Sequence, residues 1–118
     1  MRVALVSPDL LITSRVASIV QASEGQFLRV DDPGDLPASD AVDLVLVDWS
    51  YRRHTWPDVL TGRGNDPSAT QPRLILFGPH TDLAAHGEAR AAGLGPMWAR
   101  SRLLTMLPKL LAASHSVP

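Results

Sequence analysis

The chain of 118 residues contains no cysteine. Disulfides, thiolate metal sites and cysteine nucleophiles are therefore excluded, and the composition suits a cytoplasmic protein. No stretch approaches the roughly 20 apolar residues that cross a membrane, and the apolar run at the start is too short for a signal sequence. We therefore expect no membrane association.

Charge of either sign is also scarce. Only 19% of the residues are charged, and the formal net charge is -1. A general nucleic-acid binder normally carries a basic excess, so we expect no nucleic-acid partner. Hydrophobic residues make up 45% of the chain, which is enough for the core of one domain. We predict a single domain over residues 1–113 and a frayed tail over residues 114–118.

Several catalytic signatures are missing. A dinucleotide site needs a Gly-x-Gly-x-x-Gly turn after the first strand, where this sequence has Ser7-Pro8-Asp9. The single lysine, Lys109, follows no phosphate-binding loop. The four histidines lack the spacing of a zinc site, and no serine lies in a Gly-x-Ser-x-Gly turn. We therefore predict neither an enzyme nor a metal site.

Short apolar runs alternate along the chain with segments of helical character. The runs predict five strands, over Arg2–Val6, Phe27–Val30, Val42–Asp48, Leu74–Phe77 and Met97–Ala99. Helices are predicted up to about Ala22, over Asp82–Ala92 and from Ser101 onward. This alternation is typical of a parallel five-stranded sheet with helices on both faces.

The second and third connections depart from that regular order. Residues 31–40 are rich in Asp, Pro and Gly, which leaves room for only a short helix near Leu36–Ser39. After Asp48 we predict a short helix over Pro57–Leu60 and then a loop over Gly62–Pro72.

Helix starts are predicted from residues that cap helices well. Ser7 is expected to cap the first helix, with Pro8 in its first turn and Leu10 and Leu11 in its apolar stripe. His80 or Thr81 is expected to cap the helix after the fourth strand, and Ser101 the last helix. Pro108 is expected to kink that last helix because it removes a backbone hydrogen bond.

Asp48 is the principal candidate for a functional residue. It ends the run Val42–Asp48, in which five of seven residues are apolar, as in a strand buried on both faces. In open α/β sheets ligands bind at the carboxyl ends of the strands. An aspartate in that place can accept a phosphoryl group if a divalent cation is held beside it.

Four motifs carry a resemblance to a known family. They are Val3–Val6 leading into a helix, Asp43–Asp48, Leu74–Phe77 and Ala91–Arg100. Over essentially its full length the chain resembles a response-regulator receiver domain of bacterial two-component and phosphorelay signalling. The resemblance implies a flavodoxin-like (CheY-like) α/β fold, a doubly wound sheet in the order 2-1-3-4-5. Here the second helix would be shortened and the third helical region irregular.

The resemblance also assigns roles to individual residues. The phosphoacceptor of the family falls on Asp48, which is retained. The acidic pair that binds magnesium falls on Ser7 and Pro8, so both carboxylates are lost, and Asp9 comes one position late and serves the helix start. The resemblance therefore implies weak magnesium binding at most, and no other cofactor.

Three further positions of the family differ as well. The switch hydroxyl falls on Gly78 and the switch aromatic on Met97. The lysine that pairs with the phosphoryl group falls on Arg100, which keeps the charge without the compact ammonium. Arg100 is placed to form an ion pair with Asp48, and Trp49 is placed to cover the site.

These losses favour a non-catalytic pseudo-receiver that acts through protein–protein contacts without the usual aspartyl phosphorylation. Two alternatives remain open. One is a working receiver that accepts phosphate on Asp48 from a histidine kinase. The other is a small flavodoxin-like enzyme or ligand-binding domain that uses Asp48, His80 and Arg100.

The expected partner is another signalling protein. A homodimer is also possible in this family through the fourth helix, fifth strand and fifth helix, where the candidates are Trp98, Leu104 and Leu107. Aromatic and arginine side chains are frequent at interface hot spots. A second set of candidates with that composition follows Asp48, and consists of Trp49, Tyr51, Arg52, Arg53 and Trp56. A place in the core is the alternative for the leucines and for Trp56.

Overall fold

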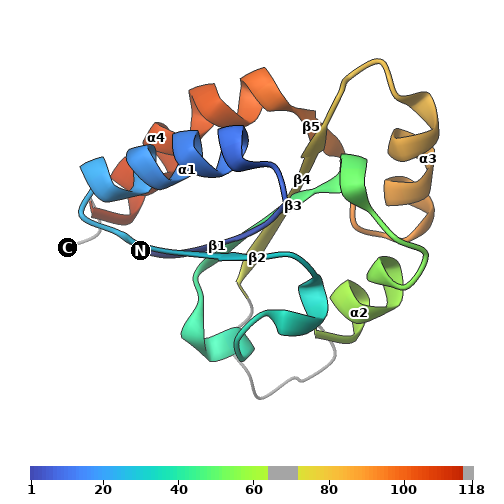
Figure 1. Cartoon of the computed structure of the whole chain (residues 1–118), viewed down its shortest axis with the longest axis horizontal. Helices are drawn as coiled ribbons and strands as arrows, with labels where there is room; N and C mark the ends of the chain where they lie inside the picture. The colour runs from blue at the N-terminus through green and yellow to red at the C-terminus, as the bar shows by residue number, and fades with distance from the viewer. Residues whose placement is uncertain (64–71, 116–118) are drawn as a thin grey trace.

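The computed structural model describes residues 1–63 and 72–115. Five parallel strands form one sheet in the order β2-β1-β3-β4-β5, as predicted (Figure 1). The strands are β1 (Arg2–Val6), β2 (Gln26–Val30), β3 (Leu44–Asp48), β4 (Arg73–Gly78) and β5 (Met97–Ala99). The central position of β3 places Asp48 at the middle of the carboxyl edge of the sheet.

Helices cover both faces of the sheet. Helices α1 (Leu10–Ala22) and α4 (Arg100–His115) lie on one face, and α2 (Trp56–Arg63) and α3 (Leu83–Ala91) lie on the other (Figure 1). Alternate side chains of β3 enter two separate buried clusters, one on each face. All five residues of β3 are buried, which confirms a strand that is covered on both sides.

The connection between β2 and β3 contains two 3-10 segments, η1 (Pro33–Asp35) and η2 (Ser39–Ala41), in place of an α-helix. The short helix predicted between them, near Leu36–Ser39, is therefore wrong. A further 3-10 segment, η3 (Trp49–Tyr51), follows β3 directly. Most of the loop predicted over 62–72 lies outside the described residues.

The helix caps differ from those predicted. Asp9 caps α1, because its Oδ1 accepts from the backbone N–H groups of Leu11 at 2.9 Å and Ile12 at 3.4 Å. Ser7 and Pro8 thus precede the helix. Asp82 caps α3 in place of His80 or Thr81, and Ser101 lies inside α4. A carboxylate suits the positive end of a helix better than a hydroxyl does, and each aspartate lies nearer the first turn.

The apolar stripe of α1 also differs in its first turn. Leu10 and Leu11 are largely exposed, and the buried positions are Ile12, Val16 and Val20, four residues apart. At the other end of the chain α4 continues to His115, two residues beyond the predicted end of the domain. Among the described residues no helix is both long enough and apolar enough to span a membrane.

Candidate functional site

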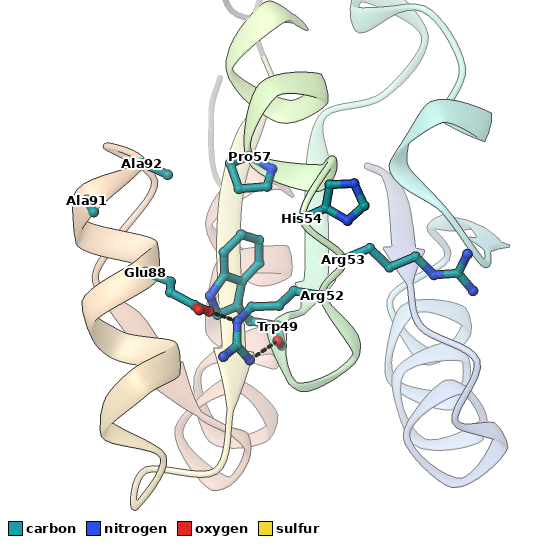
Figure 2. Close-up of a pocket in the computed structure, with 8 residues that line it drawn as sticks. All are labelled: Trp49, Arg52, Arg53, His54, Pro57, Glu88, Ala91 and Ala92. Carbon is teal, nitrogen blue, oxygen red and sulfur yellow. Dashed lines mark hydrogen bonds and ion pairs between the residues drawn. The ribbon is translucent and has the colours of Figure 1, made fainter.

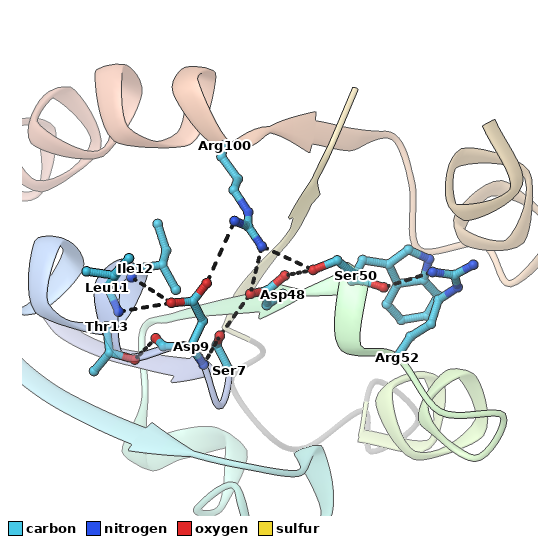
Figure 3. Close-up of polar contacts among 10 residues, drawn as sticks. Ser7, Asp9, Leu11, Ile12, Thr13, Asp48, Ser50, Arg52 and Arg100 are labelled. Atoms are coloured by element: carbon cyan, nitrogen blue, oxygen red, sulfur yellow. Dashed lines mark hydrogen bonds and ion pairs between the residues drawn. The ribbon is translucent and has the colours of Figure 1, made fainter. Parts of the chain in front are cut away.

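Register brings Ser7 to Asp48. Val6 of β1 pairs with Val47 of β3, so the next residue of each strand lies at the same level. Both side chains are fully buried, and Ser7 Oγ donates a hydrogen bond to Asp48 Oδ2 at 2.8 Å (Figure 3). The backbone of Ser7 is held from β2, since its N–H donates to Val30 O at 3.1 Å and Arg29 Nη1 donates to its carbonyl at 3.1 Å.

Ser50 satisfies the second oxygen of the same carboxylate. Its hydroxyl donates to Asp48 Oδ1 at 2.5 Å and accepts from Arg100 Nη2 at 3.2 Å. A serine hydroxyl has one proton, and here that proton goes to the carboxylate. This role of Ser50 was not predicted from the sequence. The available signal was a hydroxyl residue two positions after an aspartate that ends a strand.

Arg100 closes the site from the side of β5. As the first residue of α4 it directly follows Ala99, which pairs with Gly78 of β4. Its Nη2 lies 3.6 Å from Asp48 Oδ2, so the ion pair expected from the sequence is present (Figure 3). That distance exceeds a hydrogen bond, and the guanidinium is positioned by its bond to Ser50 instead.

Asp9 is the second carboxylate that faces Arg100. While its Oδ1 caps α1, its Oδ2 lies 3.7 Å from Arg100 Nη1. One guanidinium is therefore shared between two carboxylates, one buried and one partly buried. The expectation that Asp9 serves the helix start is confirmed, and its pairing with Arg100 is an addition that the sequence did not reveal.

Gly78 and Met97 lie against each other beside this cluster. A Cβ at position 78 would come 3.1 Å from Met97 Sδ and 3.6 Å from the backbone N of Ser50. Any side chain at position 78 would thus have to displace the flexible thioether. The receiver family has a hydroxyl side chain at the position of Gly78, and here the sulfur of Met97 lies against that position.

The oxygen donors at this edge do not fit a magnesium ion. Magnesium prefers six oxygen ligands in octahedral geometry, usually with one or more carboxylates. Here both carboxylates, Asp48 and Asp9, face the guanidinium of Arg100, and the Ser7 hydroxyl points its proton at Asp48. The described residues contain no group of three His, Cys, Asp or Glu side chains that could hold a metal.

Three of the interaction candidates lie in the core. Trp49 is buried and its Nε1 donates to Ala85 O at 3.0 Å, so it packs toward α3. Trp56 is buried and its Nε1 lies 3.2 Å from Asp32 Oδ2. Leu107 is fully buried against the sheet. These side chains present no surface to a partner, and this corrects the expectation for them.

The remaining candidates after β3 lie at or near the surface. Tyr51 and Arg53 are exposed, and Arg52 forms an ion pair through its Nε with Glu88 of α3. Arg52 and Arg53 line a groove of about 600 Å³ between α3 and the start of α2. Figure 2 shows Arg52 directed toward Glu88, and Arg53 directed away from it.

The other candidates divide between surface and core. Trp98 and Leu104 are half-buried and pack at the margin of the cluster under α4. His80 is exposed, and its carbonyl accepts from His86 Nε2 at 3.2 Å. The contacts described for His80 do not bring it to Asp48 or Arg100, which the enzyme alternative requires.

Comparison with known proteins supports the fold. No family model matches the chain, and no curated protein matches it. The crystal structure of the response regulatory domain of protein MrkE from Klebsiella pneumoniae superposes with a TM-score of 0.65. The match covers 99% of this chain and 100% of that chain, at 17% sequence identity. The chain therefore has the fold of a receiver domain.

Proposed function

We propose that this chain is a non-catalytic pseudo-receiver, a signalling module that acts by contact with another protein without aspartyl phosphorylation. One observation carries the proposal. The Asp48 carboxylate is fully buried, accepts hydrogen bonds from Ser7 and Ser50, and lies against Arg100. A carboxylate held in this way is a structural anion and not a free nucleophile.

Charge balance supports the same conclusion. Transfer of a phosphoryl group to Asp48 would add negative charge to a site that already has two carboxylates and one guanidinium. Enzymes and receivers compensate such charge with positioned cations. Arg100 is already shared between Asp9 and Asp48, so a phosphoryl group would compete with both carboxylates for its charge.

The two positions that change conformation on phosphorylation in the resembling family also differ here. Gly78 has no hydroxyl to contact a phosphoryl group, and Met97 occupies the adjacent space. A side-chain switch between these two positions is therefore absent. The module we propose has one conformation at this edge and contributes a fixed surface to its partner.

The retained Asp48, together with the positive charge kept at Arg100, favours one alternative, a working receiver. Beryllofluoride with magnesium distinguishes the two, because it mimics a phosphoryl group on a competent aspartate. Trp49 directly follows Asp48, so tryptophan fluorescence reports on the site. We expect no saturable change on addition of magnesium and beryllofluoride. A saturable change that Asp48→Asn removes would establish the working receiver.

We also propose that the chain is cytoplasmic. A further part of the proposal is a homodimer formed through α3, β5 and α4. Sizing by sedimentation tests the homodimer. We expect a mass that rises with concentration if the face pairs with itself, and a monomer at all concentrations if the module uses only other partners.

A further inference from the structure

At the edge of the sheet formed by β5, an aromatic side chain lies close to two cations. Trp98 is half-buried on β5, and the guanidinium carbon of Arg102 lies 4.5 Å from the centroid of its ring. The guanidinium carbon of Arg73, from the start of β4, lies 5.9 Å from the same ring. Both distances are within the range of cation–π attraction. Two positive charges therefore lie close to the same indole ring.

Within the described part of the chain, no ion pair balances the positive charge at this edge. No Asp or Glu follows Glu88 in the sequence, so α4 has no acidic side chain. Arg102 and Lys109 are exposed and seven residues apart on α4, which places them on the same side of the helix. Among the described residues, Arg73, Arg102 and Lys109 form no ion pair.

The helix dipole adds to this imbalance. Arg102 lies in the first turn of α4, at the positive end of the dipole, where acidic side chains are normally favoured. Arg100 in the same turn faces Asp9 and Asp48, whereas Arg102 contacts the ring of Trp98 and pairs with no described carboxylate. An incoming anion at this point would meet the dipole and several cations together.

We propose that Arg73, Trp98, Arg102 and Lys109, here called the Trp98 surface, bind an acidic segment of a partner protein. The segment carries carboxylates on either side of an apolar side chain, which packs on the exposed part of the indole. Tryptophan and arginine are among the residues most enriched at interface hot spots. The inference rests on the proposed function, and it names the chemistry of the partner.

A protein segment fits these features better than a nucleic acid does. The Trp98 surface is small, and the chain as a whole has a formal charge of -1. A phosphate backbone is bound by many cations distributed along its length. A short acidic segment needs only the few cations that flank the ring.

The local charge can be measured before any partner is known. Trp49 and Trp56 are buried, so the fluorescence accessible to ionic quenchers comes from Trp98. We expect iodide to quench it more strongly than caesium, since anions gather near the two guanidinium groups. Arg102→Gln should reduce the ratio of iodide to caesium quenching, whereas Arg53→Gln on the opposite face should leave it unchanged.

Binding is tested with a short fluorescent peptide in which glutamates alternate with leucines. We expect it to bind the full chain, to shield Trp98 from iodide, and to bind more tightly than the same peptide with glutamines. Arg102→Gln should weaken binding about threefold. Trp98→Ala should weaken it roughly tenfold or more. Trp98→Phe preserves the packing against α4 and controls for loss of fold, and Arg53→Gln is the matched control of charge.

The results separate this inference from the proposed function. Equal binding of the glutamate and glutamine peptides, or equal loss in Arg53→Gln and Arg102→Gln, would overturn the acidic-segment assignment. Displacement of the peptide by a single-stranded oligonucleotide at lower concentration than by a second acidic peptide would overturn it in favour of nucleic acid. Self-association that Arg102→Gln abolishes would assign the surface to a second copy. None of these outcomes bears on phosphorylation of Asp48, which is measured independently.

Discussion

Arg100 and Arg102 begin the same helix two residues apart, yet their surroundings are opposite. Arg100 points over the carboxyl edge of the sheet, where it meets Asp48, Asp9 and the hydroxyl of Ser50. Arg102 points to the outer side, where it stacks on Trp98 and meets no carboxylate among the described residues. Two arginines at the start of one helix thus have different environments. Arg100 is part of a closed site, and Arg102 is part of an open surface.

The difference shows how the surroundings of a residue, and not its type, decide whether its charge is paired within the described structure. In the closed site Arg100 lies against the carboxylates of Asp9 and Asp48, which is the arrangement that supports our proposal of a structural anion at Asp48. On the open surface Arg73, Arg102 and Lys109 form no ion pair with a described residue, and this is the surface that we propose for a partner. Substitutions in the two regions test this contrast.

Arg100→Met should give the largest effect. It leaves the buried Asp48 with two hydroxyl donors and no cation, and removal of one partner of a buried ion pair typically costs about 3 kcal/mol. Because Arg100 is itself partly exposed, we expect a loss of about 2 kcal/mol in the free energy of unfolding. Urea unfolding measures it.

Arg102→Met is the matched control for that variant. It removes an arginine from the same turn of α4 without leaving a buried charge unpaired. The two variants should differ clearly in stability. Equal losses in both would show that Asp48 does not depend on Arg100, and the contrast between the two regions would fail.

Ser7→Asp should destabilise the chain by a somewhat smaller amount, about 1–2 kcal/mol. It replaces a hydroxyl donor with a second carboxylate beside Asp48, where like charges repel. Magnesium should recover part of this loss in the variant and have little effect on the unmodified chain. Thermal unfolding with and without magnesium measures both, and equal stabilisation of the two proteins would contradict the account.

Arg102→Gln should change stability by only about 0.5 kcal/mol, because exposed cation–π pairs contribute little. Its main effect is expected on the quenching of Trp98. A loss of stability as large as that of Arg100→Met would mean that Arg102 supports the fold and is not a free surface residue.

The exposed ion pair of Arg2 with Asp43 should have the smallest effect. Hydrogen bonds from Arg2 hold the pKa of Asp43 below its ordinary value of 3.8, since they favour the charged carboxylate. A carboxylate whose pKa is lowered by folding stabilises the folded state at any pH above its ordinary pKa. That stabilisation is lost as the pH falls through the pKa of the folded state. Asp43→Asn should therefore lower stability slightly at neutral pH and not at low pH.

That pH dependence is measured by thermal unfolding across the acidic range at low salt. The partly exposed pair is screened by solvent, so added salt should remove the difference between Asp43→Asn and the unmodified chain. A difference that persists at high salt, or one that grows as the pH falls, would be inconsistent with this origin.

The sequence predicted the sheet well because strand formation here depends on local pattern. The bounds of β1 and β5 are as predicted, and those of β2, β3 and β4 differ by one or two residues at one or both ends. Each strand is a short apolar run limited by turn residues, and a buried parallel strand needs little more. The strand order followed from the resemblance to receivers.

The predictions for Ser7 and Trp56 were wrong because a residue distant in the sequence takes the polar group of each side chain. Ser7 is a good helix cap in isolation, but its hydroxyl is taken by Asp48, 41 residues away. Trp56 lies in a segment rich in aromatic residues and arginine, as interfaces often are. Its indole N–H nevertheless donates to Asp32, and its ring is buried in the core. Neither partner can be found from local pattern, because the fold determines which residues meet.

In the function we propose, Asp48 is a structural anion and not a phosphoacceptor. Intact-mass measurement of the full chain, after incubation with acetyl phosphate and magnesium, tests it most directly. A competent receiver in the same reaction serves as the positive control. We predict that the control gains the mass of a phosphoryl group and that this chain does not. A phosphoryl adduct on this chain that is absent from Asp48→Asn would contradict the account.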